Sequence, residues 1–121
     1  MIVTWHDKLK SAHIDAAIEY LSLFFNAGEL QEVRKKLIEH EHAIVHYKAK
    51  DLLRASGLTP LPPADTEVAA ELKKIREKVS LHPVILATIK QKFYVADGFH
   101  RICACYSLGD DTEVSGVHVD L

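Results

Sequence analysis

The strongest constraint on the fold is a pair of strand-like runs that leads directly into a helical pattern. The β-branched run 84–89 and the aromatic run 93–96 are separated by the three residues KQK, which predicts a hairpin with a three-residue loop. An Asp-Gly pair ends the second run, and the apolar residues of 99–108 then recur at helical spacing. This arrangement requires a sheet with a helix packed against it.

Helical and strand-like patterns alternate through the rest of the chain. Apolar residues spaced three and four apart predict four further helices, at 5–25, 29–39, 49–56 and 65–79. Runs rich in β-branched residues predict two further strands, at 42–47 and 113–121. No segment repeats, and the strand hairpin lies within a mixture of helices and strands. The order predicts an α+β fold with a small mixed β-sheet and packed helices.

Residues with known preferences for helix ends mark several boundaries. Thr4 is a candidate cap for the first helix, and Asn-Ala-Gly at 26–28 is a candidate stop for it. Gly57 is placed to end the short helix before it, and Asp65 is placed to cap the helix that follows. Because only a short loop separates the first two helices, they are expected to form an antiparallel helical hairpin.

Composition narrows the class of protein. The 121 residues are 48% apolar, which is enough for one domain with a hydrophobic core that needs no disulfide or metal. A formal charge of −2 gives no electrostatic reason to expect nucleic acid as a partner. No apolar run is long enough for a membrane span, and the first residues lack a secretory pattern, so we expect a cytoplasmic protein. Cys103 and Cys105 are expected to be reduced thiols packed in the core.

A glycine between a strand and a helix creates the conditions for an anion site. Gly98 permits a positive φ and close approach of a ligand, and the helix start that follows offers free N–H groups to a phosphate. Arg101 can add charge-assisted hydrogen bonds, and His100 can donate to a phosphate or transfer a proton. Asp97 can orient the histidine, hold a phosphate-bound metal ion or accept a proton from a substrate hydroxyl.

A purely structural role accounts for the same residues. Asp-Gly is a common turn pair, Asp97 is a suitable helix cap, and Arg101 can point into solvent. The residue pattern by itself leaves the anion site and the structural turn as open alternatives.

The segment HPVILATIKQKFYVADGFHRICACYSLGDDTEVSGVHVDL resembles the ParB/sulfiredoxin-like superfamily, whose members carry a strand hairpin, a Gly-x-His-Arg or Gly-Glu-Arg-Arg turn, a helix ending in Leu-Gly and a final strand. The Asp-Gly-x-His-Arg form is similar to that of free-serine kinases and uncharacterised bacterial relatives within it. The resemblance extends over residues 43–121 of a single domain spanning 1–121. Residues 1–40 then form a helical hairpin added to that core.

The resemblance implies a site for the phosphates of ATP or CTP on the turn formed by Gly98, Phe99, His100 and Arg101. Asp97 and His100 are the implied catalytic residues, and Mg²⁺ bound to the nucleotide is the implied cofactor. The expected protein is a nucleotide-binding protein, acting as a kinase-like phosphotransferase or a nucleotidase on a nucleotide or phosphorylated small molecule. The alternative is a non-catalytic regulatory or partner-binding module that keeps the fold.

Two departures from the family narrow this expectation. Phe99 occupies the position where sulfiredoxins place their catalytic cysteine, so reduction of a sulfinic acid is not expected. The turn holds one arginine, and the sequence continues for one further strand after the helix, without the helical DNA-binding domain of ParB partition proteins. A role as a DNA-partitioning clamp is therefore not expected either.

Three features outside the turn also have two interpretations. Lys50 and Asp51 are candidates for the substrate side of the site, with Asp51 the nearest match to an acid used by the serine kinases; the alternative is a solvated helix edge. The histidines at 40, 42 and 46 suggest zinc if helical, but they stand too far apart if 42–47 is a strand, so no metal site is expected. The apolar face of 14–25 is expected to be core, with a homodimer interface as the alternative.

Overall fold

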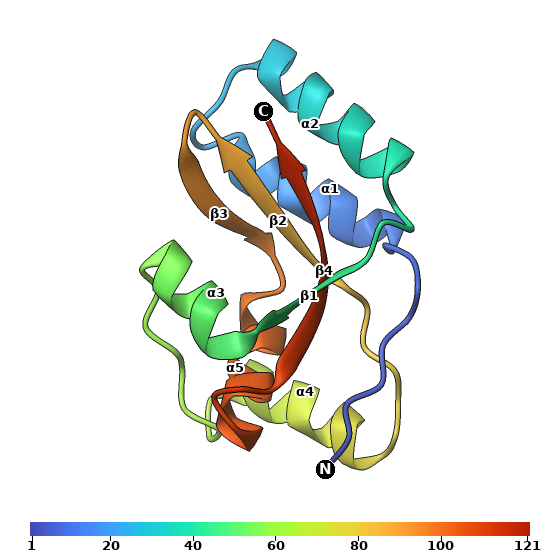
Figure 1. Cartoon of the computed structure of the whole chain (residues 1–121), viewed down its shortest axis with the longest axis vertical. Helices are drawn as coiled ribbons and strands as arrows, with labels where there is room; N and C mark the ends of the chain where they lie inside the picture. The colour runs from blue at the N-terminus through green and yellow to red at the C-terminus, as the bar shows by residue number, and fades with distance from the viewer.

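The computed structural model describes all 121 residues, which form five α-helices and one four-stranded sheet (Figure 1). The elements are, in chain order, α1 (Ser11–Leu21), α2 (Ala27–Glu39), β1 (Val45–Lys48), α3 (Ala49–Ser56), α4 (Thr66–Arg76), β2 (Val84–Ile89), β3 (Lys92–Asp97), α5 (Phe99–Leu108) and β4 (Glu113–Asp120). The predicted α+β class with a small mixed sheet is confirmed.

The sheet has the strand order β1-β4-β2-β3. β2 pairs in parallel with β4, while β1 pairs antiparallel with β4 and β3 antiparallel with β2. The turn between β2 and β3 contains only Lys90 and Gln91, both at positive φ (52° and 66°). The predicted three-residue loop is wrong because Lys92 already pairs with Ile89, and two residues at positive φ match the twist of a tight hairpin.

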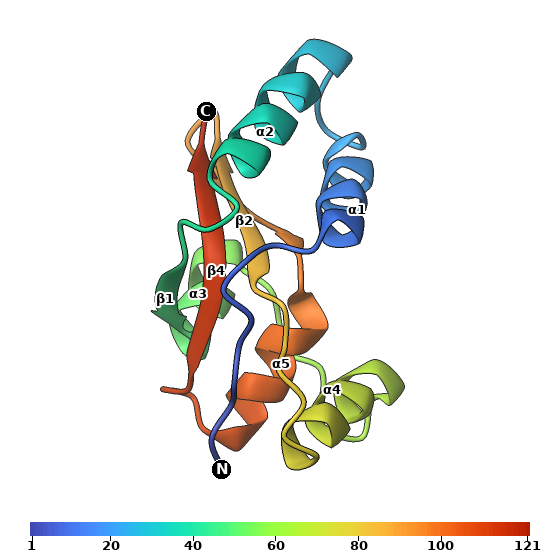
Figure 2. The same cartoon turned by 90° about the vertical axis from the view of Figure 1, so that its right-hand side faces the viewer.

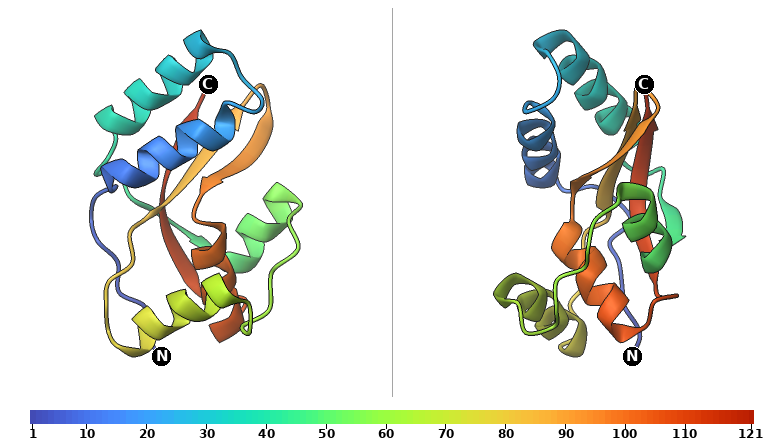
Figure 3. Two further views of the ribbon diagram at one scale, coloured as in Figure 1. Left: turned by 180° about the vertical axis from the view of Figure 1, so that it is seen from behind. Right: turned by 90° about the vertical axis from the view of Figure 1, so that its left-hand side faces the viewer.

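Helices cover both faces of the sheet, as Figure 2 and Figure 3 show. α1 and α2 pack on one face, where Ile14 and Leu21 of α1 join Ile85 of β2 and Val117 of β4 in the largest apolar cluster. α3 and α5 pack on the other face, and α4 lies against the outer side of α5. The helical hairpin is thus part of the hydrophobic core. The apolar face of 14–25 is buried at Ile14, Ala17 and Leu21, as expected, whereas Tyr20 is 41% exposed and Phe24 is 49% exposed.

The first nine residues are not helical, so the predicted helix start at residue 5 is wrong. Trp5 forms a parallel bridge with Leu81, the His6 amide donates to the Leu81 carbonyl at 2.8 Å, and the Leu81 amide donates to the Thr4 carbonyl at 2.8 Å. Thr4 therefore pairs with a distant segment and caps no helix. Figure 2 shows this extended stretch running beside the segment that precedes β2.

Some of the other predicted helix boundaries are confirmed, and others are wrong. Asp65 caps α4 by accepting from Glu67 and Val68 at 3.1 Å each, and Gly57 ends α3 in the left-handed conformation, both as predicted. Asn26 does not stop α1; instead it caps α2 in a capping box with Glu29. α4 ends at Arg76 rather than at residue 79.

β1 begins at Val45, three residues later than predicted, because the amides of Ala43 and Ile44 bond within a turn. None of the five helices has the length and apolar content that a bilayer crossing requires.

Candidate functional site

The junction between β3 and α5 has a conformation and a packing that only glycine accommodates. Gly98 is the residue before the helix and has a φ of 108°, and an added Cβ there would lie 2.5 Å from Cγ1 of Val84. No side chain accepts a hydrogen bond from the first turn of α5, so its N–H groups remain available. Asp97 is the last residue of β3, and the interpretation of Asp97 as the helix cap is wrong.

The side chain of Arg101 is buried, with 8% of its surface exposed, so the interpretation that points it into solvent is wrong. Its Nη1 donates to the carbonyls of His82 at 2.5 Å and Pro83 at 3.0 Å, and its Nη2 donates to Oδ2 of Asp97. The i, i+4 spacing directs the guanidinium back toward the end of β3. Arg101 therefore joins β3, the start of α5 and the segment before β2.

A cavity of about 420 Å³ opens beside this junction, between the start of α1, α4, and the segment that leads into β2. Its lining is almost entirely polar, with only Val79 and Leu81 as apolar members. The ionisable residues that line it are His6, Lys10, His13, Glu71, Lys74, His82, Asp97, His100 and Arg101.

The cavity brings together most of the predicted site and leaves the remainder outside. Asp97, Gly98, His100 and Arg101 all line it. Phe99 does not; its ring packs against the apolar clusters on both sides of α5, so the residue predicted to contact nucleotide serves the core instead.

Three cationic side chains, Lys10, Lys74 and Arg101, line the cavity against the two carboxylates of Glu71 and Asp97, in a protein whose formal charge is −2. Two of its cations are already paired, Arg101 with Asp97 and Lys74 with Glu71 at 3.3 Å. Lys10 is exposed and forms no ion pair, and the four histidines add donors. A recess with an unpaired cation, several imidazoles and an uncapped helix start attracts anions.

His13 is the least satisfied polar group at this site. Its Nδ1 lies 3.6 Å from Oδ2 of Asp97 and has no hydrogen-bond partner. Burial lowers the pKa of His13 to about 4, with further lowering by the charges of Arg101, His82 and Lys10. His13 is therefore neutral at physiological pH.

The pKa values of the neighbouring His82 and Asp97 are shifted as well. Burial lowers the pKa of His82, whose ring stacks on His6 with centroids 4.1 Å apart, and the proximity of His6 lowers it further. Burial raises the pKa of Asp97, and the charge and hydrogen bond of Arg101 oppose that rise. Glu67 of α4 orients the His100 ring, since Nδ1 of His100 lies 2.8 Å from Oε2 of Glu67.

Lys50 and Asp51 lie outside the cavity. Lys50 pairs with Asp111 at 2.7 Å, and its amide bonds to the Asp110 carbonyl beyond the C-terminal end of α5, whereas the cavity adjoins the N-terminal end. Asp51 pairs with Arg54 at 3.7 Å. The structure therefore agrees with the alternative of a solvated helix edge, and the two residues are not brought to the predicted site.

The histidines at 40, 42 and 46 do not converge. His42 Nδ1 lies 3.3 Å from the Asp7 carbonyl, and His46 Nδ1 lies 3.1 Å from the Ser115 hydroxyl. No group of three or more histidine, cysteine, aspartate or glutamate side chains is arranged to hold a metal ion anywhere in the chain. At the cavity, the carboxylates of Asp97 and Glu71 are both paired with cations, so these residues do not fit a resident Mg²⁺.

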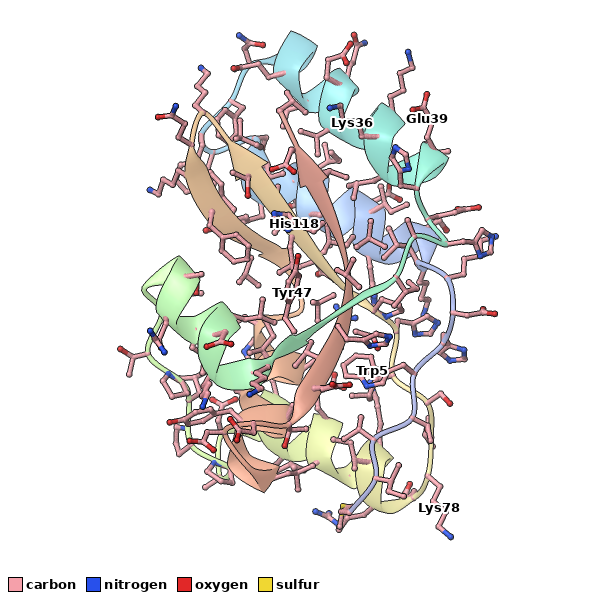
Figure 4. The ribbon with its side chains drawn as sticks, in the orientation of Figure 1. Trp5, Lys36, Glu39, Tyr47, Lys78 and His118 are labelled. Atoms are coloured by element: carbon pink, nitrogen blue, oxygen red, sulfur yellow. The ribbon has the colours of Figure 1, made fainter.

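A second polar cluster lies on the sheet face above α3, where Tyr47 and His118 are neighbours (Figure 4). The Tyr47 hydroxyl lies 3.0 Å from Nδ1 of His118, and Oγ1 of Thr88 lies 2.7 Å from Nε2. Both ring nitrogens of His118 therefore have partners, and the cluster holds β1, β2 and β4 together.

Six ionisable residues of the cavity could not be singled out from the sequence: His6, Lys10, His13, His82, Glu71 and Lys74. The first three lie in the N-terminal region, outside the segment that resembles a known family, and His82 directly precedes Pro83. The N-terminal residues meet His82 because the extended N-terminal stretch pairs with residues 80 and 81. No local spacing announces such a pairing.

Comparison with known proteins finds no matching family model, no similar curated protein and no similar solved structure. The function of the site therefore has to follow from its own geometry.

Proposed function

We propose that the protein binds the phosphate groups of a nucleotide, ATP or CTP, in the cavity at the start of α5, within a domain of the ParB/sulfiredoxin-like kind. The observation that carries the proposal is the uncapped start of α5 at Gly98, which opens into a cavity with an unpaired lysine and four histidines. A helix N-terminus combined with cationic side chains is a general solution for binding phosphate.

The structure suggests a division of roles among the residues. Lys10 and Lys74 supply positive charge, His100 supplies a donor oriented by Glu67, and Gly98 begins the helix whose first N–H groups face the phosphate in this proposal. Arg101 uses three of the five N–H donors of its guanidinium on protein acceptors. Its main contribution is to hold Asp97 in position.

The cavity fits the phosphates better than the base. Its volume lies in the range of small-molecule sites, but only two of its lining residues, Val79 and Leu81, are apolar, and none is an aromatic hydrocarbon ring that would stack on a purine or pyrimidine. The stacked imidazoles of His6 and His82 also line the cavity and offer a flat surface to a base. We therefore expect the phosphate chain to provide most of the affinity.

The second candidate is a non-catalytic module that binds the ligand without turnover. It is favoured by the pairing of Asp97 with Arg101, because both charged members of the predicted catalytic turn are occupied by each other. The cytoplasmic location expected from the sequence remains part of the proposal, since the buried free thiols Cys103 and Cys105 suit a reducing compartment.

Isothermal titration with ATP, CTP and inorganic tripolyphosphate tests the proposal. Wild-type protein is expected to bind all three, and Lys10→Ala to weaken binding roughly tenfold to a hundredfold, as expected for a lost charge-assisted contact. Lys35→Ala is the matched control, because Lys35 is exposed on α2 and does not line the cavity. The proposal is wrong if wild-type protein binds none of these ligands, or if the two variants weaken binding equally.

A further inference from the structure

Nδ1 of His13 is the only buried side-chain nitrogen or oxygen that lacks a hydrogen-bond partner. It belongs to a residue of α1 that lines the cavity. The nearest carboxylate oxygen, Oδ2 of Asp97, is 3.6 Å away, which is too far for a hydrogen bond. An unpaired buried polar group costs stability, so its presence here calls for an explanation.

The groups around His13 bear on which ring nitrogen is protonated and on the charge of the ring. Asp97 Oδ2, at 3.6 Å, is the nearest carboxylate oxygen to Nδ1, so we assign the proton of the neutral ring to that nitrogen, which leaves the lone pair on Nε2. The charged groups around it come from every neighbouring element: Lys10 before α1, Glu71 of α4, His82 before β2 and Arg101 of α5. Burial and these mostly positive neighbours lower the pKa of His13 to about 4 and keep the free ring neutral.

We propose that His13 is the general base of the cavity and activates a water molecule for hydrolysis of the terminal phosphate of the bound nucleotide. This inference rests on the proposed nucleotide binding, and it makes His13 rather than His100 the proton acceptor. Asp97 stabilises the imidazolium that forms, and Arg101 is a positioning residue that holds Asp97.

The proposed step is balanced without a further reactant. An O–H bond of water breaks and its proton moves to Nε2 of His13, while the water oxygen forms a bond to the terminal phosphorus. The bond between that phosphorus and its bridging oxygen breaks, and the electron pair stays on the nucleoside diphosphate. The imidazolium then returns its proton to solvent, so the products are nucleoside diphosphate, orthophosphate and one proton.

Ligand binding itself prepares His13 for this role. The negative charge of a phosphate offsets the charges of Lys10 and Arg101, and a nearby anion favours the protonated imidazole. The pKa of His13 therefore rises toward the operating pH when the phosphate binds, which is where a base is most effective. By linkage, nucleotide binding at a pH above the free pKa of about 4 is accompanied by proton uptake.

Orthophosphate release and nucleotide affinity, measured on the same samples, test the inference. For His13→Asn we expect dissociation constants for ATP and CTP within about threefold of wild type, and a rate of release at least about 100-fold lower. His42→Asn, an exposed histidine outside the cavity, is the control and keeps the wild-type rate. If the wild type binds nucleotide but releases no orthophosphate, or if His13→Asn releases it at the wild-type rate, His13 is not the base and nucleotide binding still stands.

A measurement on unmodified protein covers the case in which His13→Asn does not fold. NMR titration of the His13 ring is expected to give a low pKa in the free protein and a higher one with inorganic tripolyphosphate bound. A ring whose titration is the same with and without bound tripolyphosphate contradicts the inference. Failure of the wild type to bind any nucleotide or tripolyphosphate overturns the proposed function and this inference together.

Discussion

Replacing Arg101 with methionine is expected to destabilise the fold, although Arg101 belongs to a candidate site. The change removes the partner of a carboxylate on Asp97 that is 19% exposed, and it leaves the carbonyls of His82 and Pro83 without their donors. Breaking a buried ion pair by removing one member costs about 3–5 kcal/mol. Because Asp97 keeps some access to water, we expect a loss of about 3 kcal/mol, at the lower end of that range.

Urea denaturation at pH 7 gives this loss as a shift of the midpoint at constant m-value, and thermal denaturation is expected to show a midpoint lower by about 10 °C. A double-mutant cycle with Asp97→Asn isolates the interaction. Once the carboxylate is neutral, Arg101→Met is expected to cost less than it does alone. A loss below about 1 kcal/mol, or additive effects in the cycle, would refute the argument that Arg101 is a buried structural partner of Asp97.

The same region supports three further predictions. Gly98→Ala is expected to lower the free energy of unfolding in urea by about 2–4 kcal/mol, because φ is positive and the added Cβ contacts Val84. Gly57→Ala, at a positive φ with open space around it, is expected to cost about 1 kcal/mol. Equal losses would exclude the Val84 contact. The pKa of His13 is about 4 in the folded protein and near 6.5 in the unfolded chain, so its contribution to the free energy of unfolding is complete above pH 6.5 and falls by up to about 3 kcal/mol as the pH falls to 4. His13→Asn is expected to remove this pH dependence. Burial raises the pKa of Cys105 to about 12 and also raises that of Cys103, so both thiols are expected to react with a thiol reagent only at the rate of unfolding; rapid modification of native protein would contradict this.

Local sequence signals predicted much of the fold because the forces behind them act over a few residues. Asp65 caps α4 through amides two and three residues away, and Gly57 ends α3 because it tolerates positive φ. The strand–glycine–helix junction at Gly98 was predictable for the same reason. The extended course of residues 1–9 was not, because its backbone hydrogen bonds join it to Leu81, more than 70 residues away, and to Glu41.

The site was predictable only in part. The turn identified Asp97, Gly98, His100 and Arg101 as a group, and all four line the cavity. The sequence could not indicate that Arg101 is buried, since this depends on carbonyls of a segment nearly 20 residues earlier. Nor could it indicate His13, whose position follows from the packing of α1 on β2 and β3.

Phosphate binding at the start of α5 can be observed at the backbone amides of residues 98–101, by ¹H–¹⁵N NMR during titration with CTP or ATP. Saturable shifts of these amides are expected, with much smaller shifts at Lys50 and Asp51, which lie outside the cavity. If the amides of 98–101 do not move, or if the largest shifts lie at the start of α3, the phosphate does not bind at the start of α5 and the proposed site is wrong.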